Sequence, residues 1–283
     1  MDRVNSIKQL RQQVAAWRMA AECIALVPTM GNLHAGHLEL VKQAQQRADR
    51  VIVSIFVNPM QFGAGEDFGS YPRTLEQDAA QLEAVNTDLL FTPSVEEVYP
   101  HGQEQQTTVT VPGLSDTLCG ASRPGHFAGV ATVVCKLFNM AQTNLALFGT
   151  KDFQQLLVIR RMVEDLCIPI EIVGIPTVRE ADGLARSSRN GYLTADERSL
   201  APALYRILCE TSAVIAKGNR DFMALELEAK QALKAAGFKP DYYSIRNAAD
   251  LSEPSRKKNE RVILAAAYLG RARLIDNLVV ETC

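Results

Sequence analysis

The sequence predicts an α/β fold in which a doubly wound parallel sheet is followed by a smaller α+β domain. Two observations lead to this prediction. Short runs rich in valine, isoleucine and leucine alternate with segments of helical spacing as far as residue 175. Beyond Pro176 this alternation ends, and two helical segments precede three short strand-like runs. We therefore place a domain boundary there, which gives domains of residues 1–176 and 177–283.

The first domain is expected to begin with an amphipathic helix over residues 4–20, because Ile7, Leu10, Val14 and Trp17 share one face. Apolar or alternating runs predict its strands at residues 23–27, 51–57, 88–91, 107–111, 145–148 and 170–175. The first strand is expected to stop at Pro28, and 107–111 is a candidate for an edge strand. Helical spacing predicts further helices at residues 38–48, 74–85 and 130–141.

The second domain is expected to contain helices over 194–216 and 221–236, followed by strands. These strands are predicted at residues 242–246, 262–269 and 273–276.

Composition limits the possible functions. The 283 residues include 30 basic and 32 acidic side chains, for a net charge of −2, whereas nucleic-acid binders usually show a basic excess. No apolar run approaches the length of a membrane-spanning helix, and the polar N-terminus does not resemble a signal peptide. The six cysteines are scattered without close pairs, which favours a reducing cytoplasm over a disulfide framework. We therefore expect a cytoplasmic protein that binds neither nucleic acid nor membranes.

Two histidines lie where the first strand gives way to a helix. Gly31 and Gly36 bracket a turn that contains His34, and His37 follows it directly. The free N–H groups and the positive dipole end of a helix favour a polyphosphate at such a place. A metal pair or two ordinary loop residues are the alternatives, although two ligands three residues apart make a poor zinc site without a third.

Polar residues also follow other predicted strands. Asn58 and Gln61 come after the 51–57 strand, although Asn-Pro is equally typical of a plain turn. Arg123 and His126 lie in a glycine-rich stretch before a predicted helix, where an arginine can clamp an anion. Lys151 follows the 145–148 strand and is a candidate phosphate contact. The glycine-rich loop over residues 63–69 is expected to be a mobile flap.

The chemistry that these turns suggest is the loss of pyrophosphate from a triphosphate. The chain has no Gly-x-x-x-x-Gly-Lys-Ser/Thr loop and no Gly-x-Ser-x-Gly elbow, which argues against a Walker-type ATPase and a serine hydrolase. Attack on the innermost phosphorus mostly needs positioning and charge stabilisation. A carboxylate substrate is already a nucleophile, so this step needs no general base.

Four strings occur in an order that resembles one enzyme family. They are PTMGNLHAGH (28–37), SIFVNPMQF (54–62), GTKDFQQL (149–156) and SSRNGYL (187–193). Together they resemble the pantothenate synthetase (pantoate–β-alanine ligase) family, of the His-x-Gly-His nucleotidyl-transfer superfamily. The resemblance implies a Rossmann-like sheet, a homodimer, and condensation of (R)-pantoate with β-alanine by way of a pantoyl adenylate. It also implies ATP as a substrate and Mg²⁺ as its companion ion.

The resemblance implies roles for individual residues. His37 would be the central catalytic residue, supported by His34, Lys151 and Arg189. Gln61 and Gln155 would hold pantoate, Asn58 would act on the β-alanine side, and Arg123 is a candidate for the anionic substrates. Asp78 and Gln81 lie on a helix that approaches the metal in the family. The implied ATP contacts are Pro28, Thr29, Met30, Gly31, Asn32, Leu33, His34, Ala35, Gly36, His37, Gly149, Thr150, Lys151, Asp152, Val178, Arg186, Ser187, Ser188 and Arg189.

Two positions depart from the family's commonest pattern. Thr150 replaces a usual glutamate, and Arg186 replaces a usual apolar residue, so both changes make the site more positive. We expect Arg186 to face solvent or to add a phosphate contact. The alternatives are another His-x-Gly-His adenylyltransferase, which would share that loop but not PTMG, NPMQF or the second domain, or a protein that binds ATP without turnover.

Overall fold

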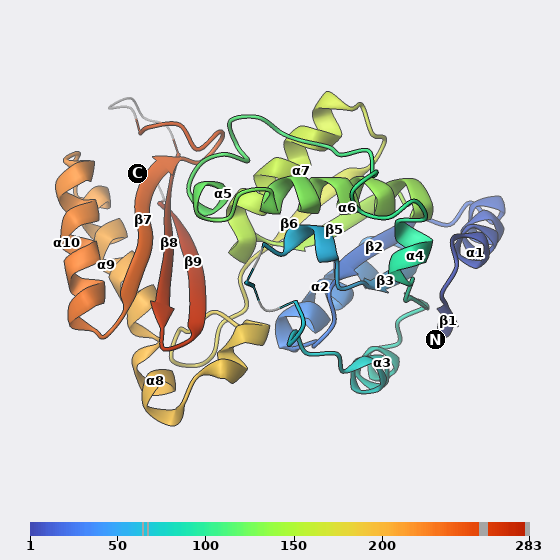
Figure 1. Ribbon diagram of the computed structural model, residues 1–283, viewed down its shortest axis with the longest axis horizontal. Helices are drawn as coiled ribbons and strands as arrows, with labels where there is room; N and C mark the ends of the chain where they lie inside the picture. The colour runs from blue at the N-terminus through green and yellow to red at the C-terminus, as the bar shows by residue number, and fades with distance from the viewer. Residues whose placement is uncertain (64, 67, 255–259, 281–283) are drawn as a thin grey trace. The chain divides into compact units, whose positions relative to one another are not determined.

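The computed structural model describes residues 1–63, 65–66, 68–254 and 260–280 (Figure 1). The chain forms two compact units. Unit 1 contains Met1–Thr150 and Val158–Pro176, and unit 2 contains Lys151–Leu157 together with the chain from Thr177 onward. The loop predicted to be a flap is described except at residues 64 and 67, which lie outside the described residues.

Unit 1 is built on a six-stranded parallel sheet, as the apolar runs predicted. Its strands are β1 Asp2–Val4, β2 Ile24–Thr29, β3 Arg50–Ile55, β4 Leu89–Phe91, β5 Leu145–Gly149 and β6 Glu171–Ile175. They lie in the order β1-β4-β3-β2-β5-β6, and every neighbouring pair is parallel. The chain runs outward from β2 through β3, then returns to β5 on the other side of β2. This reversal creates a switch point between β2 and β5, where open α/β sheets bind their ligands.

Helices cover both faces of this sheet (Figure 1). The helices of this part of the chain are α1 Ile7–Met19, α2 Ala35–Gln45, α3 Leu75–Ala84, α4 Val95–Val98, α5 Cys119–Ser122, α6 His126–Ala141 and α7 Phe153–Asp165, with the short 3₁₀ helices η1 Pro59–Gln61 and η2 Thr150–Asp152. Residues 151–157, in η2 and the first part of α7, belong to unit 2. One core forms where α2 and α3 pack on β2, β3 and β5 through residues such as Val41, Leu82 and Val53. The opposite face carries α6, which contacts both β2 and α1.

The expectation that Pro28 ends the first strand is wrong, because β2 continues to Thr29 and Pro28 pairs with Ser54. The hydrogen bonds explain why proline is tolerated. Thr29 accepts from the Phe56 N–H, so Thr29 faces β3 and Pro28 faces β5. The β2–β5 pairing ends at Leu26. The missing N–H of Pro28 therefore falls beyond the last paired residues on that side.

The predicted edge strand at 107–111 is also wrong, because these residues join neither sheet of the described chain. The Val109 N–H donates instead to the Thr132 side chain on α6 at 2.9 Å, and Val111 is buried. The alternation of polar and apolar residues over 107–111 therefore belongs to an extended segment that packs on α6 and not to a sheet strand. The edge strands of the sheet are β6 and β1, and β1 is a strand of three residues that the sequence did not predict.

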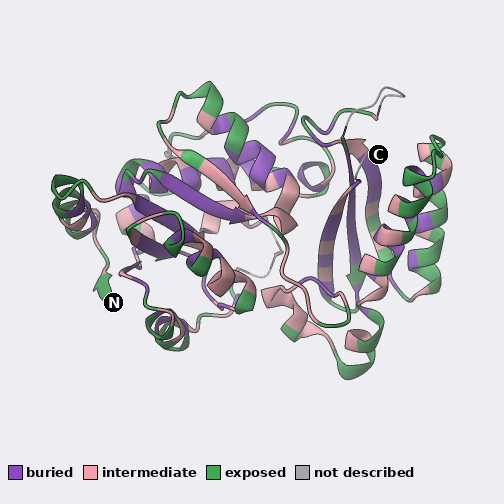
Figure 2. Cartoon of the chain, turned by 180° about the vertical axis from the view of Figure 1, so that it is seen from behind, coloured by how far each residue is buried: buried purple, intermediate pink, exposed green. Residues whose placement is uncertain are grey.

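Unit 2 contains an antiparallel sheet, β7 Lys239–Asn247, β8 Arg261–Leu269 and β9 Ala272–Val280. Its helices are η3 Ser188–Tyr192, α8 Ala195–Leu200, α9 Ala203–Ala216 and α10 Phe222–Ala235. The helix predicted over 194–216 is therefore split, with Pro202 as the N-cap of α9. A core of its own joins α9 and α10 to the sheet through residues such as Leu208, Leu233 and Tyr243. Figure 2 shows buried strands and exposed outer helix faces.

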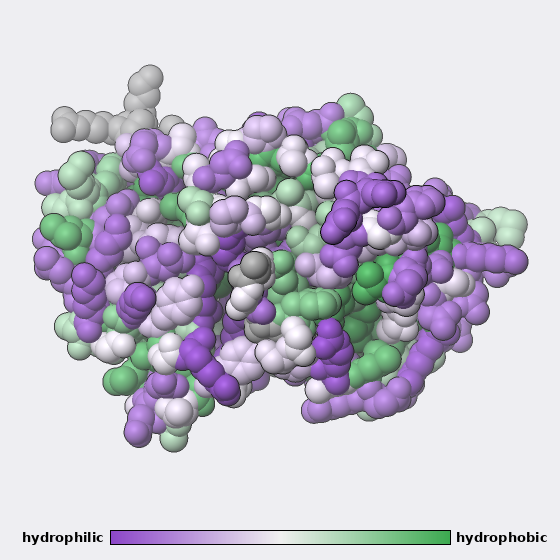
Figure 3. Space-filling view, in the orientation of Figure 1, coloured by the Kyte–Doolittle hydropathy of each residue, from purple (hydrophilic) through white to green (hydrophobic). Residues whose placement is uncertain are grey.

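The surface is mixed in character. In Figure 3 hydrophilic residues dominate, and hydrophobic ones gather within unit 1 between the labels α2, α3 and α4 of Figure 1. Across the described residues, none of the helices is long and apolar enough to cross a membrane. Five cysteines are free thiols, and Cys283 lies outside the described residues.

Candidate active site

The turn after β2 places two histidines at the start of α2. His34 is the N-cap, and its Nδ1 accepts the Gly36 N–H at 3.1 Å. His37 lies three residues further on, and its Nδ1 accepts the His34 N–H at 3.3 Å. The two rings stack, with centroids 4.1 Å apart. The pair therefore forms a capping box in which histidines take the places usually held by serine or threonine and glutamate.

This cap fixes the protonation pattern of both rings. A neutral imidazole carries one N–H donor and one acceptor nitrogen. Because Nδ1 of His34 and of His37 each accepts a backbone N–H, Nε2 carries the hydrogen in both neutral rings. The helix start thus holds two Nε2–H donors beside the positive end of the helix dipole, and this combination suits a phosphate.

Asp78 on α3 holds the turn from beneath. Its side chain is buried, with 1% exposure, and its two oxygens accept the N–H groups of Asn32 at 2.9 Å and Leu33 at 2.8 Å. The Thr74 hydroxyl donates to the same carboxylate at 3.1 Å. Gly31 passes close by with φ +81°, a conformation that favours glycine. Asp78 therefore acts on the turn through the backbone, and these contacts leave its carboxylate poorly placed to bind a metal directly.

Gln61 lies on η1, which follows β3, and is joined to the histidine turn. Its Nε2 donates to Met30 Sδ at 2.8 Å, and its Oε1 accepts from Asn58 Nδ2 at 3.2 Å. Asn58 is buried and also bonds to the Gly129 carbonyl and the Tyr99 hydroxyl. Burial raises the pKa of Tyr99, which keeps this hydroxyl a donor. Asn58 thus orients Gln61 from within the protein.

Arg123, the candidate anion clamp, is paired with an internal carboxylate. Its guanidinium binds Glu66 through two hydrogen bonds of 2.6 and 2.5 Å, and Arg123 Nη1 lies 3.0 Å from His126 Nε2. His126 Nδ1 is 2.8 Å from the Gln61 carbonyl oxygen, so it donates to that oxygen. The hydrogen bond from Arg123 holds the pKa of the Glu66 carboxyl below its usual value. This pair ties the 63–69 loop to the start of α6.

Lys151 and the segment after Pro176 belong to unit 2. Lys151 lies 3.6 Å from the Asp152 carboxylate, and its carbonyl accepts from Asn277 Nδ2 at 2.8 Å. Ser187 is the N-cap of η3 and accepts the Arg189 N–H. Arg186 pairs with Glu180 at 2.9 Å and keeps a partly exposed side chain. The added arginine therefore already has an acidic neighbour within the protein.

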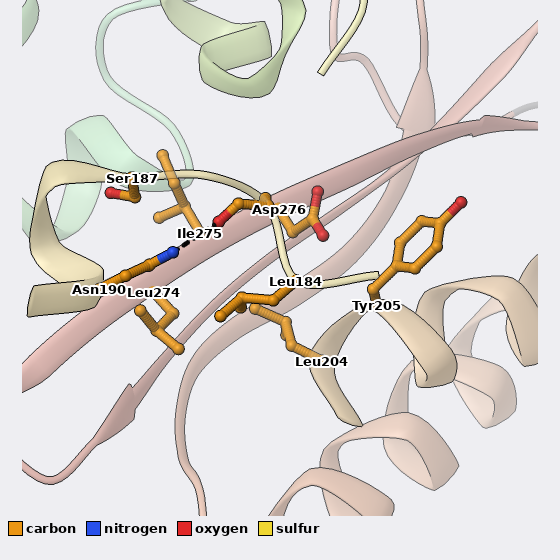
Figure 4. Close-up of a pocket in the computed structure, with 9 residues that line it drawn as sticks. Leu184, Ser187, Asn190, Leu204, Tyr205, Leu274, Ile275 and Asp276 are labelled. Carbon is orange, nitrogen blue, oxygen red and sulfur yellow. Dashed lines mark hydrogen bonds between the residues drawn. The ribbon is translucent and has the colours of Figure 1, made fainter. Parts of the chain in front are cut away.

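A small cavity of about 10 Å³ lies behind Ser187 in unit 2. Its lining is drawn in Figure 4, where the Asn190 amide donates to the Ala185 carbonyl at 3.0 Å. The cavity has room for about one water molecule, and apolar side chains form much of its wall. It is too small for a substrate and belongs to the packing under η3.

Sequence comparisons agree with the four strings. The family profile of pantoate-β-alanine ligases matches residues 2–279. The chain belongs to the pantoate–β-alanine ligase family. It is 60% identical over 273 residues to a pantothenate synthetase of Shewanella amazonensis, covering 96% of this chain and 97% of that protein. A pantothenate synthetase of Stutzerimonas stutzeri is 59% identical over 281 residues, covering 99% and 98%.

Solved structures of the same family share this fold. A pantothenate synthetase from Thermus thermophilus matches with a TM-score of 0.91 and 47% identity, over 99% of this chain and 100% of that one. A pantoate–β-alanine ligase from Francisella tularensis, complexed with β-γ ATP and β-alanine, matches with a TM-score of 0.84 and 36% identity, over 100% and 99%. The Rossmann-like prediction is therefore confirmed.

The family motifs and the geometry overlap in part. In unit 1, Met30 is bonded to Gln61, and His34 and His37 are bonded to each other. Gly149 ends β5, the neighbour of β2, and Thr150 follows it. That unit 2 serves the same nucleotide through Lys151 and residues 178–189 stays a prediction. The supporting contacts of Asp78, Tyr99, Glu66, Asp276 and Asn277 were not predicted. Only Asp78 gave a signal, because it lies on the apolar face of its helix with Ala79 and Leu82.

Proposed function

We propose that this chain joins (R)-pantoate to β-alanine, using ATP and releasing AMP and pyrophosphate. Membership of the pantoate–β-alanine ligase family over residues 2–279 supports this proposal. The ligands of the Francisella tularensis relative, an ATP compound and β-alanine, support the same substrates here.

One structural observation carries the proposal within unit 1. The histidine turn follows β2 and the Gly149 turn follows β5, and these adjacent strands flank the switch point of the sheet. The first turn of α2 adds a positive dipole end and two Nε2–H donors. Such a place favours a triphosphate over an uncharged ligand.

The reaction that fits these groups has two displacements. The pantoate carboxylate attacks the α-phosphorus, the bond to the β-phosphate oxygen breaks, and pyrophosphate leaves. The β-alanine amine then attacks the acyl carbon of the adenylate, an amide forms, and AMP leaves with the bonding electron pair. We assign the Nε2–H donors of His34 and His37 to the charge that develops on phosphate oxygens. Lys151 and Arg189 would bind phosphate charge, and Arg186 would stay with Glu180.

The substrate side is assigned to Gln61 and Gln155, which would hold pantoate by its hydroxyls and carboxylate. Asn58 would orient Gln61 rather than touch substrate, because its amide is buried and bonded within the protein. Arg123 would meet a substrate carboxylate only after giving up Glu66.

Mg²⁺ is proposed to enter with the triphosphate, whose charge it would partly neutralise. Among the residues that the structure describes, no group of three or more histidine, cysteine or acidic side chains is arranged to hold a metal ion. Phosphate oxygens and water would therefore supply most of its ligands, as is usual for Mg²⁺. Gln81 is partly exposed and could touch that hydration shell, whereas Asp78 would not ligate the ion directly.

A homodimer and a cytoplasmic location complete the proposal. The free thiols favour a reducing compartment. Sedimentation of the purified chain would test the dimer.

AMP formation from ATP tests the function. We expect AMP and pantothenate only when pantoate and β-alanine are both present, and pantoate-dependent exchange of labelled pyrophosphate into ATP without β-alanine. AMP formation independent of pantoate, or transfer of AMP to a phosphate acceptor, would indicate another adenylyltransferase. ATP binding without either activity would leave only a binding protein.

A further inference from the structure

Strand β9 of unit 2 holds both segments that the proposed function assigns to ATP in that unit. Asn277 Nδ2 donates to the Lys151 carbonyl at 2.8 Å, across 126 residues of sequence. The preceding residue, Asp276, binds Arg179 through hydrogen bonds of 2.6 and 2.9 Å. Successive side chains of a strand point to opposite faces, so two neighbouring residues can hold two different segments.

The Asp276–Arg179 pair is the stronger of these attachments. Asp276 is 4% exposed and accepts both guanidinium donors, and it also accepts the Asn277 N–H at 2.8 Å. The Arg179 guanidinium lies 3.5 Å from the ring centroid of Tyr205 and donates to the Gly183 carbonyl. Removing one member of a buried, hydrogen-bonded charge pair leaves the other without compensation, which is strongly unfavourable.

Arg179 also connects the Asp276 pair to the loop that carries Ser187 and Ser188. It pairs with Ala185 in an isolated β-bridge, and the Arg186 N–H donates to the Val178 carbonyl at 3.0 Å. Asn190 then donates to the Ala185 carbonyl, which closes the loop over η3 (Figure 4). Fixing Arg179 therefore fixes the backbone that carries Ser187 and Arg189.

We propose that Asp276 and Asn277 are positioning residues for ATP. They lie outside the family strings and act only through Arg179 and the Lys151 backbone. β9 pairs with β8 along its whole length, so it provides a fixed support for both segments. The inference rests on the proposed function, because the two segments matter only if they bind the nucleotide.

Asp276→Asn and Asn277→Ala test the inference, with Asp241→Asn as the matched control. Asp241 also pairs with an arginine of the same sheet, Arg273, at 3.1 and 2.7 Å, but through one carboxylate oxygen and at an exposed position. Calorimetry with ATP alone, without pantoate, gives the ATP dissociation constant, and a second titration gives that of pantoate. We expect Asp276→Asn to weaken ATP binding about tenfold or more and Asn277→Ala by about two- to tenfold, following the usual worth of charged and neutral hydrogen bonds.

Failure of the proposed function and failure of the positioning role give different results. If the unsubstituted chain neither binds ATP nor forms AMP, the proposed function fails. If the unsubstituted chain binds ATP and forms AMP, the two variants are compared with Asp241→Asn. Equal ATP affinity in all three, at a matched loss of melting temperature, would show that the positioning role is wrong. An equal loss of ATP and pantoate affinity would also contradict it. Should Asp276→Asn not fold, Asn277→Ala decides alone, because it removes one hydrogen bond and no charge.

Discussion

At the scale of single residues, buried polar groups shape the site without being exposed to solvent. Asp78 shows this most clearly, because the residue is only 1% exposed. Its carboxylate accepts the Asn32 and Leu33 N–H groups, which would otherwise donate to water. Hydrogen bonds to a charged acceptor are stronger than neutral ones. The turn that leads to His34 is therefore held by a residue 46 positions away from Asn32.

Replacing Asp78 with asparagine should weaken ATP binding without changing the Mg²⁺ requirement. The amide turns one acceptor into a donor that opposes a backbone N–H, so the turn loses its support. We expect the KM for ATP to rise about tenfold or more, and faster amide hydrogen exchange at Asn32 and Leu33. Kinetics at several Mg²⁺ concentrations and exchange in the ligand-free protein would measure both.

Glu83→Gln is the control for this prediction, because Glu83 is on the same helix and its side chain is half-exposed. A higher Mg²⁺ concentration for half-maximal activity in Asp78→Asn, with unchanged exchange at the turn, would instead identify Asp78 as a metal ligand.

At the scale of elements, the site depends on how closely η1 approaches α6. Gly129 on α6 allows this approach, because an added Cβ would lie 2.2 Å from the Met60 carbonyl oxygen and 2.8 Å from the Gln61 N. The Gly129 carbonyl also accepts from Asn58, so the helix both admits η1 and bonds to it.

Gly129→Ala should displace η1 and weaken pantoate binding. The obstacle is backbone rather than a flexible side chain, so one of the two elements must move. We expect a loss of stability of about 1–3 kcal/mol, as for an overpacked core, and a KM for pantoate that rises more than that for ATP. Urea denaturation and steady-state kinetics would measure these effects. Gly69→Ala, which meets nothing within 4 Å, should leave both unchanged; equal behaviour of the two variants would contradict the prediction.

The Glu66–Arg123 pair should make the 63–69 loop sensitive to acid. The pKa of Glu66 is lowered in the folded protein from its ordinary value of 4.5, so the pair stabilises the fold above that pH. This contribution is lost as the pH falls through the lowered pKa. Glu66→Gln should therefore be less stable than the unsubstituted chain at pH 7, and the difference should shrink below pH 4.5.

Denaturation curves between pH 3 and pH 7 would measure this difference. Glu76→Gln serves as the control, because the Glu76 side chain is 83% exposed and such surface pairs contribute little. A stability difference for Glu66→Gln that is the same at both ends of the pH range would argue against the ion pair.

At the scale of the whole molecule, each unit has its own hydrophobic core. Leu82 is fully buried in the core of unit 1, and Leu208 is fully buried in that of unit 2. Leu82→Ala and Leu208→Ala should each cost about 2–5 kcal/mol of unfolding free energy. We expect hydrogen exchange to lose protection mainly in the unit that carries the substitution. A uniform loss along the chain from either variant would show that the two cores unfold together.

The sequence predicted the parallel sheet and the three C-terminal strands because buried strands must be apolar, and this requirement is visible in short stretches of sequence. The antiparallel pairing of the three strands was not predicted. It misjudged Pro28 and the 107–111 segment, since both depend on which neighbour a backbone group faces. The site motifs are local strings and were visible in the same way. Their supports were not, because contacts such as Asn277 with Lys151 join residues that only the fold brings together.

The capping histidines have one more consequence. An imidazolium carries hydrogen on both nitrogens, so adding a proton to His34 or His37 would set a donor against the N–H that its Nδ1 now receives. Protonation of either ring should therefore fray the first turn of α2, and the phosphate contacts proposed for His34 and His37 would be lost in the same event.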